Sequence, residues 1–212
     1  MPLLAALSLS DFTAALASDA PAPGGGSAAA ATGASGAALL AMVCRLTLGK
    51  EKYRDAWEEL SPLVERLDTT RGRLLELVDE DTRAYEAIVS ARRLPKDTPE
   101  LKAARQGAVD AATFLATSVP MQTAFFAQSA LGLAPLVAEK GNPNAASDAW
   151  VAALLLSAAV RGALANVRIN LPGVTDAELA RGFREDAAEL ETKAGEAAEK
   201  ALTVARARGV AA

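Results

Sequence analysis

Hydrophobic residues recur every three or four positions over most of the chain, which is the spacing that places them on one face of an α-helix. In the longest such stretch the apolar positions are Leu60, Leu63, Leu67, Leu74, Leu77, Val78, Tyr85 and Ile88. No stretch alternates apolar and polar residues as a half-buried strand does. The pattern therefore predicts an all-α protein. Since neither a linker nor an internal repeat divides the chain, residues 1–212 are expected to form a single domain.

Capping residues, glycines and prolines divide this pattern into separate helices. Helices are expected over residues 8–18, 27–48, 50–93, 98–119, 147–171 and 175–209, with more helical sequence between residues 120 and 140. Val119-Pro120 is expected to divide one helix and Pro135 to interrupt the next, because proline lacks the amide hydrogen that a helix interior uses. Thr175 and Glu178 have the spacing of a capping box. Helices of this length predict an up-and-down bundle.

A turn rich in proline and glycine, residues 21–27, precedes a run of alanines. Its glycines let the backbone turn tightly and approach another surface, because they have no Cβ. Ser27 is expected to cap the helix that follows, whose free amide groups and dipole favour an acceptor or an anion. The turn matches neither the P-loop nor the dinucleotide-binding fingerprint. A purely structural turn is the alternative to a ligand-binding turn.

Small residues recur every four positions along the helix after this turn, at Ala29, Gly33 and Ala37. Another helix can approach closely along such a face, so the helix is expected either at the centre of the fold or at a subunit interface. Because the face is too apolar to be left in contact with water, at least a homodimer is expected.

Composition and charge exclude several classes of protein. Hydrophobic residues make up 51% of the chain but aromatic residues only 4%, which suits closely packed helices. The net charge is −4 and no basic block occurs, which argues against a nucleic-acid partner. The apolar windows 28–48 and 149–171 are unsuited to a membrane, since the second contains Arg161 and Arg168. With no signal peptide and one cysteine, a cytoplasmic protein is expected.

The chain contains no histidine, which removes Ser-His-Asp triads, Cys-His dyads and histidine-based metal sites from consideration. Cys44 lies among apolar neighbours in a helix, so an inert buried thiol is expected rather than a nucleophile. Acid–base chemistry would therefore depend on Asp, Glu, Lys or Tyr side chains.

Two groups of charged residues could form a site, and each has a structural alternative. Lys50, with Lys52 and Tyr53, follows the small-residue helix and could hold an anionic group, or could simply complement the negative end of the helix dipole. Asp81 lies in an otherwise apolar helical segment, with Tyr85 four residues later on the same face. A carboxylate beside a buried face would have an altered pKa and could act as an acid or base, whereas an exposed acidic patch is the alternative.

A third group lies at a turn and the helix start after it, and consists of Asn142, Asn144, Ser147 and Asp148. Plain helix capping is the alternative for these residues. Asn166, Arg168 and Asn170 lie near the end of the same apolar helix. Because buried polar groups need partners, these three residues indicate a hydrogen-bond network or a ligand.

Several separated motifs occur together in the order and approximate spacing of one family. They are Pro-x-Pro-Gly-Gly-Gly-Ser (21–27), Met42-Val43-Cys44 through Leu48-Gly49-Lys50, Asp79-x-Asp81, Leu94-Pro95-Lys96, Gly141-Asn142 with Ser147-Asp148, Val151-Ala152-Ala153 and Asn166-Val-Arg-Ile-Asn-Leu171. On these residues the chain resembles the cyclodeaminase/cyclohydrolase family, over roughly residues 8–205. That family includes the C-terminal domain of formimidoyltransferase-cyclodeaminase and a stand-alone methenyltetrahydrofolate cyclohydrolase.

The resemblance implies a helical homodimer that binds a tetrahydrofolate derivative in a cleft between subunits. Cyclodeaminases close 5-formimidoyltetrahydrofolate to 5,10-methenyltetrahydrofolate and release ammonia, whereas cyclohydrolases add water to the methenyl bridge to give 10-formyltetrahydrofolate. Both activities need no metal and no cofactor beyond the tetrahydrofolate substrate.

Ser27 and the motif at 166–176 look closer to cyclodeaminases, which puts that activity slightly ahead. A cyclodeaminase without a transferase domain would receive its substrate from a separate formimidoyltransferase. A folate-binding helical bundle without catalysis is a further alternative.

The resemblance also implies roles for individual residues. Asp81 is the first candidate for the catalytic proton carrier, and Asp148 is the second candidate or a fixed acceptor for the pterin. Lys50 and Lys96, with Arg93, would meet the glutamate tail. The substrate-binding residues expected in all are Gly24, Gly25, Gly26, Ser27, Lys50, Tyr85, Lys96, Asn142, Ser147 and Asn166.

Overall fold

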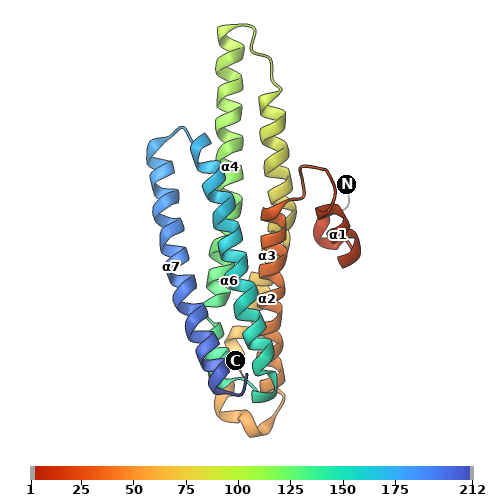
Figure 1. Cartoon of the computed structure of the whole chain (residues 1–212), viewed down its shortest axis with the longest axis vertical. Coiled ribbons are helices and arrows are strands. Elements are labelled where there is room, and N and C mark those ends of the chain that lie inside the picture. Colours follow the sequence, from red (N-terminus) through yellow and green to blue (C-terminus); the bar gives the residue numbers. More distant parts are fainter. Residues whose placement is uncertain (1–2, 211–212) are drawn as a thin grey trace.

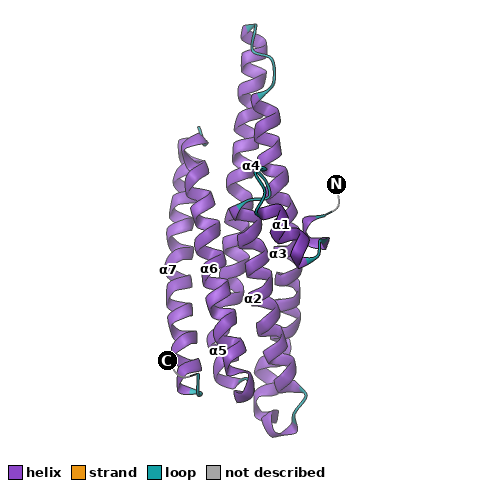
Figure 2. Ribbon diagram, turned by 45° about the vertical axis from the view of Figure 1, so that its right-hand side comes forward, coloured by secondary structure: helices purple, strands orange, loops and turns teal. Residues whose placement is uncertain are grey.

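The structure is a computed structural model that describes residues 3–210, which form a bundle of long helices (Figure 1). No strand occurs among these residues, as the periodicity predicts (Figure 2). The α-helices are α1 (Leu9–Leu16), α2 (Gly25–Leu48), α3 (Trp57–Arg92), α4 (Pro99–Leu131), α5 (Ala134–Lys140), α6 (Ala146–Asn170) and α7 (Ala177–Ala207). Short 3₁₀ segments are η1 (Leu4–Ala6), η2 (Glu51–Ala56), η3 (Pro143–Ala145) and η4 (Leu171–Gly173).

Consecutive long helices run in opposite directions, so the predicted up-and-down bundle is confirmed (Figure 1). Helix α2 packs against α3 and α6, α4 packs against the same two helices, and α7 packs mainly against α6. The hairpin of α3 and α4 extends beyond the ends of α6 and α7 (Figures 1 and 2). The N-terminal segment with α1 lies against the side of α3.

The small residues of α2 allow its neighbours to approach closely. A Cβ added at Gly33 would lie 3.3 Å from Ala159 of α6 and 3.3 Å from Leu74 of α3. Ala37 is completely buried. The small-residue face therefore lies at the centre of the fold, which is one of the two locations that the sequence predicts for it. The face is covered within one chain and gives no support to the predicted dimer.

Helix α4 contains Pro120 in its interior, so the predicted division at Val119–Pro120 is wrong. Proline cannot donate a hydrogen bond to the carbonyl four residues earlier, which here belongs to Ala116. Asn170 of α6 satisfies that carbonyl, since its Nδ2 donates to the Ala116 oxygen at 2.6 Å. A side chain from a neighbouring helix therefore replaces the missing backbone bond, and the helix continues.

The start of α2 differs from the prediction, because Gly24 rather than Ser27 is its N-cap. The helix begins two residues earlier than expected, so Ser27 lies inside the first turn. At α7 the cap is Asp176, whose carboxylate accepts two amide groups of the first turn. Thr175 instead donates its hydroxyl to Asp110 of α4 at 3.2 Å. The predicted break at Pro135 is confirmed, since α4 ends before it and α5 begins.

Three helical stretches are long and apolar enough to cross a membrane by length and composition alone, namely Gly25–Leu48, Pro99–Lys140 and Pro143–Gly173. Between 44% and 61% of the apolar window of each stretch is buried inside the bundle. Packing of the helices against one another therefore accounts for about half of this apolar surface, and Pro143–Gly173 leaves the largest share uncovered.

Candidate functional site

The side chain of Asp81 connects α3 to the first turn of α2. Its Oδ2 accepts a hydrogen bond from the backbone N–H of Ser27 at 2.8 Å and lies 3.1 Å from the Ser27 hydroxyl. Ser27 is fully buried, and its Oγ also lies 2.8 Å from the carbonyl oxygen of Val78 and 3.4 Å from the hydroxyl of Thr82. These four residues, Asp81, Ser27, Val78 and Thr82, are called the Asp81 cluster below.

The glycines of the turn make room for this cluster. Gly26 is buried, and a Cβ there would lie 2.5 Å from Cγ of Asp81, closer than non-bonded atoms approach. Gly25 is exposed, and a Cβ there would lie 3.5 Å from Nδ2 of Asn166, an ordinary contact distance. The structure thus brings together three of the predicted elements, namely the glycine turn, Asp81 of α3 and Asn166 of α6.

Two opposing effects act on the protonation of Asp81. Burial raises the pKa of its carboxyl, because the charged form loses hydration, while the hydrogen bonds from the side chain and backbone of Ser27 lower the pKa. Burial is the larger effect, so the pKa lies above its ordinary value. A carboxyl group with a raised pKa keeps its proton to higher pH than an ordinary aspartate does, which suits it to proton transfer.

Asp79, two residues before Asp81, serves a different part of the molecule. It is buried and accepts the backbone N–H groups of Leu4 at 2.6 Å and Ala5 at 3.3 Å. Residues two positions apart on a helix point to different sides. Asp79 therefore fixes the N-terminal segment to α3, and the two carboxylates do not act as a pair.

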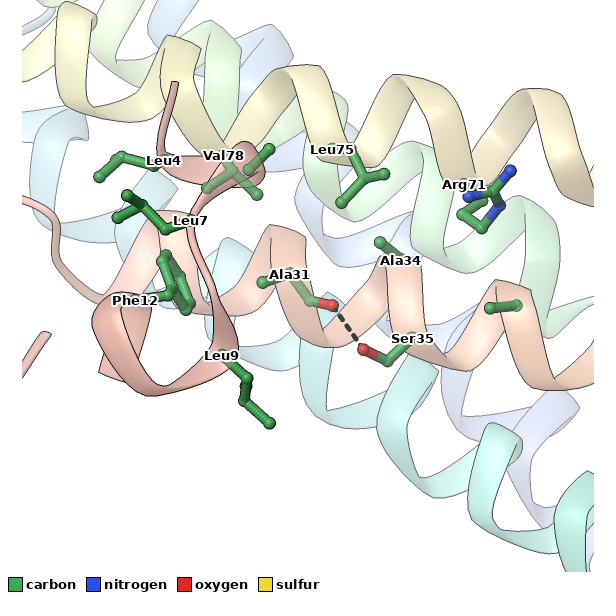
Figure 3. A pocket seen from close by; sticks show the side chains of 12 residues that line it. Leu4, Leu7, Leu9, Phe12, Ala31, Ala34, Ser35, Arg71, Leu75 and Val78 are labelled. Atoms are coloured by element: carbon green, nitrogen blue, oxygen red, sulfur yellow. Dashed lines mark hydrogen bonds between the residues drawn. The ribbon is translucent and has the colours of Figure 1, made fainter. Parts of the chain in front are cut away.

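The N-terminal segment covers two cavities beside α3. One cavity of about 320 Å³ is largely apolar, with Phe12 of α1 and Val78 of α3 in its wall (Figure 3). The other cavity, of about 560 Å³, is lined by Pro23 of the turn and by Thr82 and Arg83 of α3. Because Thr82 also belongs to the Asp81 cluster, this second cavity adjoins the candidate site and is large enough to hold part of a small ligand.

Other predicted residues lie at the opposite end of the bundle. Lys50 follows the C-terminal end of α2 and is exposed, while Ser147 and Asp148 lie in the first turn of α6. Asp148 and Asn166 are 18 residues apart on this helix, which separates them by about 27 Å along its axis. One subunit therefore does not bring Asp81 and Asp148 to the same bound molecule.

Asn142 is buried beside that end and holds the turn after α5 in place. Its backbone N–H donates to Oγ1 of Thr47 at 2.8 Å, and its Oδ1 accepts the hydroxyl of Tyr53 at 2.9 Å. The backbone N–H and the side-chain oxygen of Asn142 are thus engaged within the protein, whereas the sequence-based interpretation has Asn142 binding a substrate. Tyr85 and Lys96 are exposed on α3 and on the loop after it, and their roles in binding stay predictions.

Cys44 is fully buried, as predicted, and burial raises the pKa of its thiol to about 11, which disfavours the reactive thiolate. Within residues 3–210, no group of three or more His, Cys, Asp or Glu side chains could hold a metal ion. Neither observation adds a nucleophile or a metal ligand to the Asp81 cluster.

The sequence pattern does not reveal the partners that hold Asp81. It predicts Ser27 as the cap of its own helix, whereas both donors of Ser27 point toward α3. Val78 takes part through its backbone carbonyl, which no residue type reveals. The available signal is the pair of small residues Gly26 and Ser27, which can lie flat against a side chain of another helix.

Three comparisons describe what this chain is similar to. The family model for formiminotransferase-cyclodeaminase matches residues 8–189. The methenyltetrahydrofolate cyclohydrolase of Methylorubrum extorquens is 44% identical over 81% of this chain and 80% of its own length. The formimidoyltransferase-cyclodeaminase of Sus scrofa is 41% identical over 73% of this chain, which spans only 29% of that protein. The crystal structure of formiminotetrahydrofolate cyclodeaminase from Thermotoga maritima superposes with a TM-score of 0.86 at 29% identity, over 95% of this chain and 97% of that one.

Proposed function

This chain belongs to the formiminotransferase-cyclodeaminase family, and we propose that it closes 5-formimidoyltetrahydrofolate to 5,10-methenyltetrahydrofolate with release of ammonia. The observation that carries the proposal is the environment of Asp81, whose carboxyl is partly buried beside the glycine turn and has a raised pKa. Departure of ammonia requires a proton donor, and a carboxyl with a raised pKa keeps its proton to higher pH than an ordinary aspartate does.

Starting from the protonated formimidoyl group, the reaction moves one proton from N10 to the departing amino group. N10 attacks the formimidoyl carbon, so a C–N10 bond forms, and the bond from that carbon to the amino group breaks as ammonia leaves. Asp81 gives its proton to the leaving nitrogen and takes the proton that N10 loses, so it returns to its starting form. Asp148 suits a fixed acceptor for the pterin, because a helix N-terminus favours a charged carboxylate.

A second candidate function is methenyltetrahydrofolate cyclohydrolase, and the 44% identical relative favours it. In that reaction water adds to the methenyl carbon and the C–N5 bond opens, which gives 10-formyltetrahydrofolate. The first step then needs a base, so the carboxylate form of Asp81 would be the active one. The two reactions therefore require opposite resting states of the same residue.

We also propose that the protein is a homodimer. Most outward positions of α6 form an apolar face, bordered by the exposed Arg161 and Arg168, since spacings of three, four and seven residues return to the same side of a helix. These exposed residues are Val151, Leu154, Ala158, Ala165 and Ile169. Helix α2 packs beside α6 (Figure 1), and its Leu46 is a further large apolar side chain that is 43% exposed. A contiguous apolar face of this kind is expected to be covered by a partner, here a second copy.

An antiparallel partner would also complete the site. Asp81 and Asp148 lie toward opposite ends of one subunit, so a two-fold axis across the middle of α2 and α6 brings the Asp148 end of one copy beside the Asp81 end of the other. The folate would then lie between subunits, with Asp81 from one and Lys50, Ser147 and Asp148 from the partner. This arrangement accounts for site residues that a single subunit keeps apart.

The remaining expectations belong to the same proposal. A formimidoyltransferase would supply the substrate, since the Sus scrofa relative carries both activities in its name. The protein would need no cofactor beyond tetrahydrofolate. A cytoplasmic location agrees with its buried free thiol, Cys44.

The test supplies 5-formimidoyltetrahydrofolate and 5,10-methenyltetrahydrofolate separately and follows the methenyl absorbance. A cyclodeaminase raises the absorbance with the first compound and releases one ammonia per methenyl group. A cyclohydrolase lowers it with the second compound and leaves the first unchanged. Binding of both compounds without turnover would instead indicate a folate-binding protein that lacks catalysis.

A further inference from the structure

The larger of the two cavities beside α3 combines an apolar wall with a cation. Its volume is about 560 Å³. The N-terminal segment and the turn supply apolar lining that includes Leu4, Leu7 and Pro23, and α3 supplies Thr82 and Arg83. Apolar walls with a few well-placed polar groups are typical of sites for small molecules. The cavity therefore suits a ligand that has an apolar part and a negative charge.

The guanidinium group of Arg83 is available to such a ligand. Arg83 is exposed, and among residues 3–210 its side chain forms neither an ion pair nor a hydrogen bond. Arg73 of the same helix differs, since it pairs with Glu76 and Glu80. A guanidinium group matches the geometry of a carboxylate and can bind it through two parallel hydrogen bonds. A carboxylate on the ligand would therefore meet an unused partner in Arg83.

Two acidic residues, Asp79 and Glu86, also line the cavity. The carboxylate of Asp79 accepts the backbone N–H groups of Leu4 and Ala5, so its charge is stabilised within the protein. Glu86 is exposed, and water and salt weaken its repulsion of a bound anion. Glu86 follows Arg83 by three residues but does not pair with it, so the two opposite charges can be varied separately.

The place of the cavity limits which part of a folate it could hold. Thr82 lies in the cavity wall, and its hydroxyl lies 3.4 Å from that of Ser27 in the Asp81 cluster. In tetrahydrofolate, N10 carries the p-aminobenzoyl ring directly, and the glutamate follows that ring. The ring must therefore lie close to the group that exchanges a proton with N10, for which we propose Asp81. The pterin extends from the other side of the reacting bridge.

We propose that this cavity binds the p-aminobenzoylglutamate part of the substrate, with the ring against Leu4, Leu7 and Pro23 and a glutamate carboxylate on Arg83. The inference rests on the proposed function in taking a tetrahydrofolate derivative as the ligand and Asp81 as its proton carrier. Arg83, rather than Lys50, then determines the preference for a substrate with a glutamate tail.

The test uses two compounds that differ only in the glutamate, 5-formyltetrahydrofolate and 5-formyltetrahydropteroate. Calorimetry measures the affinity of each for the wild-type protein and for Arg83→Gln. The wild type is expected to prefer the glutamate compound by about 5- to 10-fold, the size of one partly exposed charge-assisted contact. Arg83→Gln should lose most of this preference and keep the affinity for the pteroate compound. A purely structural role of Arg83 would instead weaken both compounds equally.

Two further substitutions separate the charges that could act on the glutamate. Glu86→Gln removes the neighbouring negative charge and is expected to strengthen binding of the glutamate compound alone. Lys50→Gln is expected to leave the preference for glutamate unchanged. If Lys50→Gln abolishes the preference and Arg83→Gln does not, the glutamate lies at Lys50 and the inference is wrong. A wild-type protein without any preference contradicts it as well.

The apolar wall has its own test, since it is expected to contact the ring that both compounds share. Leu7 is partly buried, and Leu7→Ser should weaken binding of the two compounds by the same factor. Leu9→Ser is the matched control, because Leu9 is 78% exposed and does not line this cavity. Circular dichroism confirms that both variants fold. Unchanged affinity of Leu7→Ser for both compounds would show that the ring lies elsewhere.

Binding and turnover can fail independently. If the wild-type protein converts neither folate substrate but prefers the glutamate compound through Arg83, the proposed function fails and the cavity assignment holds. If it converts a folate substrate but the preference does not depend on Arg83, the assignment fails and the proposed function holds. Absence of binding of both formyl compounds overturns the assignment, whatever the turnover assay shows.

Discussion

Asp81 fills the space that a side chain on Gly26 would occupy, since a Cβ on Gly26 would lie 2.5 Å from Cγ of the carboxyl group. The contact joins the first turn of α2 to α3 and leaves no room for a methyl group between them. The two residues are therefore expected to depend on each other, and a change of either one should displace the carboxyl from Ser27.

Gly26→Ala tests this dependence. We expect the added methyl group to displace Asp81 and to reduce turnover by about 10²-fold or more, since it removes a positioned proton carrier. Gly72→Ala is the control, because a Cβ there would meet no atom within 4 Å and the residue lies outside the candidate site. Steady-state kinetics and circular dichroism of both variants check the prediction. Equal activity of the two variants would contradict it.

Asp81→Asn and Asp148→Asn should affect different kinetic constants. Loss of the proton carrier is expected to lower kcat by about 10²- to 10⁴-fold in Asp81→Asn, with a modest loss of folate affinity. Asp148→Asn is expected mainly to weaken binding. Titration of folate binding beside the turnover assay separates the two effects, and Glu58→Gln, an exposed change on α3, is the control. A large rate loss in Asp148→Asn at unchanged affinity would exchange the two roles.

Asp81 should also make the stability of the protein depend on pH. Because its pKa is raised in the folded protein, the folded state binds this proton more tightly than the unfolded state does. Its contribution to the free energy of unfolding therefore falls as pH rises from about 3.9 through the folded pKa. Asp81→Asn should gain stability relative to the wild type between pH 4 and pH 7. Urea unfolding at both values measures this, and a difference independent of pH would show that the carboxyl is not desolvated.

Mixed dimers test whether two subunits share a site. A subunit with Asp81→Asn and a subunit with Asp148→Asn would form one intact site and one doubly altered site in each heterodimer. Random mixing after reversible dissociation should then restore about a quarter of the wild-type activity. Activity equal to the mean of the two parent variants would mean that each site lies within one subunit. Light scattering of the wild-type protein gives the oligomeric state independently.

Substitution of two helical glycines by alanine should change the free energy of unfolding in opposite directions. A Cβ at Gly36 of α2 would lie 2.7 Å from Leu156 and 3.1 Å from the carbonyl oxygen of Ala152, so Gly36→Ala should lower the free energy of unfolding by about 1–3 kcal/mol. A Cβ at Gly72 of α3 would meet no atom within 4 Å, so Gly72→Ala should raise it by about 0.5–1 kcal/mol. Urea denaturation measures both, and a stabilised Gly36→Ala would contradict the close packing of α2 against α6.

Local interactions determine most of what the sequence alone predicts correctly. The helical class and the break at Pro135 follow from residue spacing and from the chemistry of proline, which act within one or two turns of the chain. The burial of Cys44 follows in the same way from its apolar neighbours. The resemblance to a folate enzyme family rests on motifs whose order is visible in the chain itself.

The sequence-based predictions are wrong where the hydrogen-bond partner of a residue lies in a distant part of the chain. Pro120 was expected to divide a helix, but the Nδ2 group of Asn170, on another helix, bonds the carbonyl of Ala116 that the proline leaves free. Ser27 was expected to cap its own helix, but its donors meet α3. Local propensity does not report such partners, because they depend on how each helix is rotated against its neighbours.

That rotation also decided what each of the two neighbouring acidic residues contacts. The sequence already favours Asp81 as the candidate, but it does not show that Asp79 bonds the N-terminal segment while Asp81 bonds Ser27. Helix rotation results from the packing of many small contacts along α2, α3 and α6, and no single residue encodes it. The sequence thus determined the helices and the chemical groups available, and tertiary packing decided which of those groups meet.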